Sequence, residues 1–153
     1  MFGSSSATRL GVALGVFAAL WSTSACTTEG TAHRVPGTLV STVVGSWTGS
    51  YTCAQGSTKL TLTVEAAADN GTNRAVFTFG PGGTDTASSG SFAMTAADDQ
   101  VGGIAFTATE WIVAPRNYVM VNAQADKVSS TQMSGTISGE GCTTFSVTKS
   151  TGV

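Results

Sequence analysis

The sequence predicts an all-β protein: a single antiparallel domain of eight strands, folded either as an up-and-down barrel or as a flattened sandwich. Apolar and polar residues alternate with a period of two from Gly45 almost to the C-terminus. Turn-forming segments interrupt this alternation at intervals of roughly 8–15 residues, as in all-β domains. No helical period follows residue 21. Closure into a barrel is favoured because it leaves no exposed edge strands.

The first half of the domain is expected to contain four strands. These are Gly45–Cys53, Ser57–Ala67, Arg74–Phe79 and Gly90–Ala97. In the second strand Leu60, Leu62 and Val64 alternate with polar residues, which indicates one buried face and one solvated face. Asp69-Asn70-Gly71 is expected to turn the chain, since Asn-Gly tolerates the positive φ of tight hairpins. Gly80–Ser89 is expected to be a loop.

The second half is expected to supply the other four strands. These are Gly103–Thr109, Asn117–Asp126, Thr131–Ser138 and Cys142–Lys149. Trp111 and Val113 either continue the inner face of the fifth strand or line a corner that ends at Pro115. One side of the sixth strand is expected to carry Val119, Val121, Ala123 and Ala125, and the other Tyr118, Met120, Asn122 and Gln124.

Cys53 and Cys142 are expected to form a disulfide between the first and last strands. Two cysteines at the ends of a domain usually pair in an exported chain. Closing a loop of about 90 residues contributes roughly 4–5 kcal/mol in the chain-entropy model. Cys142 has the opposite parity to Phe145 and Val147. Either a bulge precedes Phe145, or the bridge lies at the strand ends, where parity no longer holds.

Residues 1–25 are expected to be a signal peptide and are left out of the fold prediction. Arg9 precedes the apolar run Leu10–Trp21, which is shorter than the roughly 20 residues that cross a bilayer as a helix. Ser24 and Ala25 then precede Cys26. This arrangement resembles a bacterial lipoprotein signal, which implies that Cys26 is diacylated and becomes the new N-terminus. Thr23 departs from the lipoprotein pattern, which has Leu or another aliphatic residue at this position. The alternative to lipidation is ordinary signal-peptide cleavage near Ala25, followed by secretion.

Residues 26–43 are expected to form a flexible tether, residues 44–149 the β-domain and residues 150–153 a short tail. The tether region contains Gly30, Pro36 and Gly37 and shows no apolar period. It also holds His33, the only histidine of the chain. We interpret His33 as an exposed linker residue.

Composition argues against several classes of function. The net charge is −2 and no run of Lys or Arg occurs, so a nucleic-acid-binding surface is not expected. No histidine accompanies the serines of the domain, and the only adjacent carboxylates are Asp98 and Asp99, in an expected turn. We therefore expect a monomer that is not an enzyme and that carries no metal or cofactor.

Four aromatic residues are the most suggestive feature: Trp47, Tyr51, Trp111 and Tyr118. One interpretation is that they fill one end of the barrel, with their polar atoms satisfied at its rim. The other is a ligand or partner site, because Trp and Tyr dominate such surfaces. In that case Asn122 and Gln124, in register with Tyr118, would add polar contacts, and Arg116 a charged rim.

Three short stretches resemble known families. Gly45-Ser46-Trp47 resembles the start of lipocalins and avidin-like barrels, which implies a Trp that closes one barrel end and an interior that binds a small ligand. Tyr51-Thr52-Cys53, the late cysteine and the leader are similar to membrane-bound inhibitors of c-type lysozyme, although their Ser-Gly-x-x-Tyr motif is absent. Trp47-x-Gly49-x-Tyr51-x-Cys53 with Gly141-Cys142-x-x-Phe145 also resembles exported bacterial β-domains that bring no activity with them.

The resulting expectation is a non-catalytic lipoprotein on the outer leaflet of the cell membrane that binds an envelope protein or polymer. The alternatives are a carrier of a small apolar ligand and a lysozyme-inhibitor-like protein. A carrier predicts a cavity of several hundred Å³ lined by Phe77, Phe92 and Phe106. A partner-binding module predicts instead an exposed aromatic patch at Trp111 and Tyr118.

Overall fold

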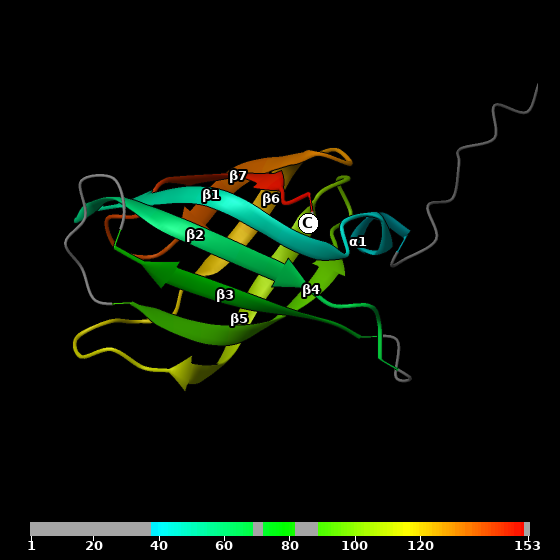
Figure 1. The fold of residues 1–153 in the computed structure, drawn as a ribbon. Helices are drawn as coiled ribbons and strands as arrows, with labels where there is room; N and C mark the ends of the chain where they lie inside the picture. Colours follow the sequence, from blue (N-terminus) through cyan, green and yellow to red (C-terminus); the bar gives the residue numbers. More distant parts are fainter. Residues whose placement is uncertain (1–37, 69–71, 82–88, 152–153) are drawn as a thin grey trace, which may run out of the picture. The chain divides into compact units, whose positions relative to one another are not determined.

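The structure, a computed structural model, describes residues 38–68, 72–81 and 89–151. The described strands form one closed antiparallel barrel in which each strand pairs with the next and the last pairs with the first (Figure 1). The predicted all-β class is confirmed, and the barrel is the correct choice over the sandwich. The expected signal peptide, most of the tether and the Asp69-Asn70-Gly71 turn lie outside the described residues.

In the described part of the chain, one short helix precedes eight strands. The elements are α1 (Thr38–Thr42), β1 (Gly45–Cys53), β2 (Gly56–Val64), β3 (Asn73–Gly80), β4 (Gly90–Asp98), β5 (Ile104–Val113), β6 (Asn122–Val128), β7 (Gln132–Ser138) and β8 (Thr144–Lys149). None of the helical segments in the described ranges has the length and apolar character needed to traverse a bilayer.

The two-residue period of the sequence becomes the inside and outside of the barrel. On β2, Leu60, Leu62 and Val64 are buried while Lys59 is exposed. The seam between first and last strands obeys the same rule, with the buried Tyr51 opposite the buried Phe145. Alternate residues point to opposite faces of a strand, so this pairing keeps both apolar sets in one core.

The two ends of the barrel differ. Strands β2, β4 and β6 finish at one end, which we call the closed end. Helix α1 is hydrogen-bonded to Asp98 at this end. The Asp98 carboxylate accepts the backbone N–H groups of Leu39 (2.9 Å) and Val40 (2.7 Å). At the other end, the open end, β1, β3, β5 and β7 finish. Alternate connections of an up-and-down barrel always share an end, so the described residues gathered at the open end are 54–55, 81, 89, 114–121 and 139–143.

The predicted tether ends earlier than expected. The sequence predicts a tether over residues 26–43, but α1 occupies Thr38–Thr42, and Val40 and Val43 are fully buried. These residues belong to the domain. A helix of five residues is too short to show a period in sequence, and it depends on tertiary contacts for its stability.

The sixth strand begins later than predicted. The alternation suggested Asn117–Asp126, but β6 starts at Asn122. Asn117 has a φ of 62°, which a strand residue does not adopt. Val119 is consequently 75% exposed rather than inward-facing, while Val121 is buried as expected.

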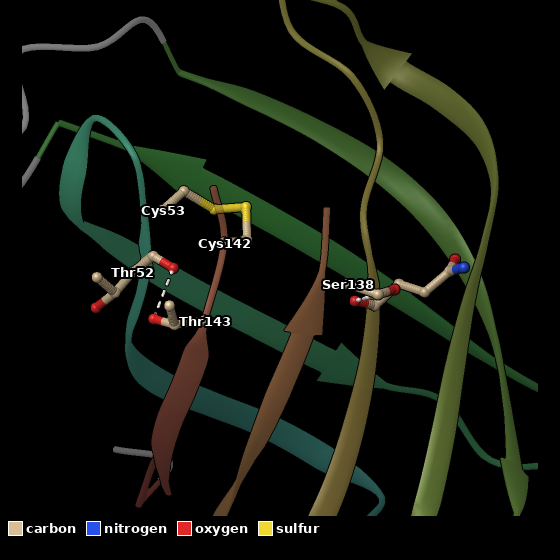
Figure 2. Close-up of a disulfide and its surroundings, with 6 residues drawn as sticks. Thr52, Cys53, Ser138, Cys142 and Thr143 are labelled. Carbon is tan, nitrogen blue, oxygen red and sulfur yellow. Dashed lines mark hydrogen bonds between the residues drawn. A yellow bond between two sulfur atoms is a disulfide. The ribbon is translucent and has the colours of Figure 1, made fainter. Parts of the chain in front are cut away.

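The predicted disulfide is confirmed: Cys53, at the end of β1, is bonded to Cys142 (Figure 2). Cys142 precedes β8 instead of lying within it, so the bridge lies at the strand ends and the parity conflict disappears. The backbone N–H of Thr143 donates to the carbonyl of Thr52 (2.9 Å), which continues the β1–β8 contact up to the bridge.

Candidate functional site

The closed end is packed by the protein's own residues. Trp47 is fully buried, and its indole N–H donates to the carbonyl oxygen of Val43 (2.7 Å). The Nζ of Lys149 lies 5.2 Å from the centroid of the Trp47 ring, within the range of a cation–π contact. Trp47 therefore closes one barrel end with its polar atom satisfied.

The open end contains a pocket of about 320 Å³. Its walls come from the last residues of β1 and β3, from the start of β4 and from the connections at this end. They are Tyr51, Cys53, Gln55, Phe77, Phe79, Phe92, Asn117, Tyr118, Val119, Val121, Glu140 and Cys142. The disulfide is thus part of the pocket wall and also holds two rim segments together.

Aromatic rings dominate the pocket. Phe77 and Phe92 are stacked with centroids 4.8 Å apart, and the Tyr51 ring meets Phe77 edge-on at 5.2 Å. Nearer the rim, Tyr118 stacks on Phe79 at 5.3 Å. Such offset and edge-to-face pairs stabilise one another beyond their buried area. The rings therefore form a continuous wall from the core up to the mouth.

Polar groups lie at the mouth. Gln55 and Glu140 are exposed and come from the β1–β2 and β7–β8 connections, and Asn117 comes from the segment that leads into β6. An apolar interior with a few polar groups at its edge is the usual composition of a small-molecule site.

The structure separates the four aromatic residues that the sequence grouped together. Tyr51 and Tyr118 line the open-end pocket, whereas Trp111 is not among its lining residues and is partly buried against Phe92 at 5.4 Å. Trp47 closes the opposite end. The interpretation that all four fill one end of the barrel is therefore wrong.

The predicted polar contributors do not join this site. The Asn122 side-chain oxygen accepts the backbone N–H of Ala108 (2.9 Å), and the Gln124 amide donates to the Asp99 carboxylate. Both side chains lie opposite in parity to the buried Ala123, on the outside of the barrel. Arg116 is exposed on the segment before β6 and is not part of the pocket wall.

Several pocket residues were not predicted. Phe77 and Phe92 were expected to line a carrier cavity, and they do, but Phe106 does not. Phe79, Gln55, Asn117, Val121 and Glu140 were missed. The signal was present in the sequence, because all of them lie at or next to connections that an up-and-down barrel places at the same end as Cys53.

Comparisons with protein families, with curated proteins and with solved structures find no match to this chain. Among the described residues, no group of three or more His, Cys, Asp or Glu side chains is arranged to hold a metal ion.

Proposed function

We propose that this protein is a non-catalytic binding protein whose open-end pocket takes a small apolar molecule. The observation that carries this proposal is the aromatic pocket of about 320 Å³. Ligand sites of small molecules commonly occupy about 300–1,000 Å³, lined mainly by apolar and aromatic side chains. The Gly45-Ser46-Trp47 resemblance to lipocalins and avidin-like barrels points the same way.

The division of the core supports this proposal over a partner site centred on Trp111. The closed half is filled by Trp47, Phe106 and their neighbours, whereas the open half leaves a space among its rings. Trp111 packs against Phe79 (6.4 Å) and Phe92 (5.4 Å) and is only partly exposed. Its main contacts are therefore within the barrel.

Binding of a neutral fluorescent probe, N-phenylnaphthylamine, to the mature chain tests the proposal. We expect saturable binding, and Tyr118→Ala should weaken it about 3–10-fold by removing one ring of the wall. Ile112→Ala, at a residue that is 56% exposed and outside the pocket, is the matched control and should bind as the unaltered chain does. An absence of saturable binding, or equal affinity of the Tyr118→Ala variant, would contradict the proposal.

A second candidate is contact with an envelope protein or polymer through the open-end rim. Ile112, Val113 and Val119 are exposed there, at 56%, 55% and 75%. Capture of an envelope component should then be lost when Ile112 and Val113 are both replaced by serine, and should persist when a ligand fills the pocket. Equal capture by the double variant would reject this candidate.

We also propose that the chain is exported and anchored through Cys26. Support comes from the leader alone, with its apolar run followed by Ser24-Ala25-Cys26. Two acyl chains on Cys26 would suffice for stable membrane attachment, which one chain would not give. Cys26→Ser should release the protein from the membrane fraction. Retention of that variant would show that lipidation is not the anchor.

A further inference from the structure

The described wall of the open-end pocket has an acidic side chain but no basic one. Among the described residues of its wall, Glu140 is the only Asp, Glu, Lys, Arg or His, and the other polar groups are the amides of Gln55 and Asn117 and the hydroxyls of Tyr51 and Tyr118. No Lys, Arg or His of the described ranges lines the pocket.

The basic residues of the described part of the chain lie elsewhere or are already paired. Lys149 lies over Trp47 at the closed end, and Lys127 is near that end of β6. Arg74 forms an ion pair with Glu110 (3.8 Å). Lys59 is exposed on the outside of β2, and Arg116 is exposed outside the pocket wall. Among the described residues, therefore, no basic side chain forms an ion pair with Glu140.

The aromatic rings add to the same electrostatic preference. The face of an aromatic ring carries partial negative charge and attracts a cation within about 6 Å of its centroid. The closed end already uses this interaction, with Lys149 placed over Trp47 at 5.2 Å. Within the described residues, no Lys or Arg lies over the rings of Phe77, Phe92 or Tyr118 in the same way.

We infer that the open-end pocket selects apolar molecules that carry a positive charge, such as those with a quaternary or tertiary ammonium group. The apolar part would pack against Phe77 and Phe92, and the ammonium group would lie near the mouth, between Tyr118 and Glu140. An anionic ligand would meet the Glu140 carboxylate and the ring faces, and the described residues of the wall include no basic group to offset them. This inference rests on the proposed binding function and names the class of ligand.

A matched pair of ligands isolates the charge. Phenyltrimethylammonium and tert-butylbenzene have nearly the same shape and differ only by a nitrogen cation in place of a carbon atom. Titration of the mature chain with each, followed by NMR shifts of the pocket residues, should show the cation binding at least about fivefold more tightly. Added salt should weaken only the binding of the cation.

Two variants identify the role of Glu140. Glu140→Gln should reduce the preference for the cation at least about twofold and leave the affinity for tert-butylbenzene unchanged. Glu65→Gln removes the same charge from an exposed residue next to the closed end and should leave both affinities unchanged.

The outcomes are separable. If neither ligand shifts the pocket resonances, the proposed binding function itself fails. If tert-butylbenzene binds the unaltered chain as tightly as the cation does, the pocket binds apolar ligands but the inferred charge selection is wrong. If the preference survives Glu140→Gln unchanged, the role assigned to Glu140 is wrong.

Discussion

The two ends of the barrel are built from the same strands but are finished differently. At the closed end, Val40 of α1 and Val43 just after it are buried in the core, and Trp47 is fully buried with its N–H donated to the Val43 carbonyl. At the open end, the Phe79 ring contacts those of Tyr51 and Tyr118, and the three rings line an open pocket.

Strand β1 contributes one large buried aromatic residue to each end of the barrel. Its residues Trp47 and Tyr51 share the inner face, four positions apart, and both are large and buried. One belongs to a packed plug and the other to a pocket wall. The distinction depends on what covers each end, which is a short helix in one case and polar connections in the other. A buried aromatic residue is therefore not by itself a sign of function.

The largest expected effect comes from removing the disulfide at the open end. Replacing Cys53 and Cys142 by serine frees a segment of 89 residues in the unfolded chain and should lower the free energy of unfolding by about 4–5 kcal/mol. Urea denaturation of the mature chain measures this change. A loss below about 1 kcal/mol would show that the open end holds together without the bridge.

A comparable loss is expected at the closed end from Trp47→Ala. Removing this buried ring leaves a cavity under α1 and should cost about 3–5 kcal/mol. Trp47→Phe keeps an aromatic ring but leaves the Val43 carbonyl without its donor, and should cost about 1–3 kcal/mol. Denaturant unfolding of both variants checks this order. If Trp47→Ala lowered the free energy of unfolding no more than Tyr118→Ala does, the claim that the closed end is filled and the open end is not would be wrong.

Asp98→Ala tests the attachment of α1. It removes the acceptor of two backbone N–H groups, those of Leu39 and Val40, and should cost about 1–2 kcal/mol. Hydrogen exchange at these two amides should accelerate, because the helix would open locally. Asp126→Ala, at an exposed position of β6, is the control. Unchanged protection of Leu39 and Val40 would show that Asp98 does not hold the helix.

The smallest expected effect is a pH dependence at the closed end. The pKa of Asp99 lies below its ordinary value, chiefly because the backbone N–H of Gly103 donates to its carboxylate (2.6 Å). The folded state therefore favours the ionised carboxylate. This contribution to stability is present at pH values above the unfolded pKa of about 3.9 and is lost as the pH falls through the lower folded pKa.

Asp99→Asn should accordingly flatten the fall in the urea midpoint between about pH 5 and pH 2. The unaltered chain measured over the same range is the reference. An identical pH profile for the variant would mean that Asp99 contributes nothing to acid unfolding.

The strands and the disulfide could be predicted from the sequence because a barrel wall has one wet and one dry face. That constraint is clear in the second half of β2, where Leu60, Leu62 and Val64 alternate with Thr61 and Thr63. The cysteine pairing followed from their positions at the two ends of the domain. The strands follow from the local alternation of residues, and the disulfide follows from the number and positions of the cysteines.

The site was harder to predict because it depends on which end of the barrel each residue reaches. The alternation predicts that Tyr118 is in register with Asn122 and Gln124. However, Asn117 has a φ of 62°, and the strand begins only at Asn122, so Tyr118 lies outside it. That interruption brings the Tyr118 ring onto Phe79 and leaves the two amides outside. Helix α1 was missed because its stability comes from Asp98, 58 residues further along the chain than Val40.

The link between α1 and Asp98 also has a consequence for the order of folding. The helix is the first described element of the chain, yet the carboxylate that holds its backbone belongs to the end of the fourth strand. A helix of five residues does not persist alone in water. Thr38–Thr42 is synthesised before β4. We therefore expect this segment to remain unstructured until β4 has joined the sheet. Contacts between residues so far apart in sequence form slowly, so we expect the cap of the closed end to be a late event that follows assembly of the first hairpins.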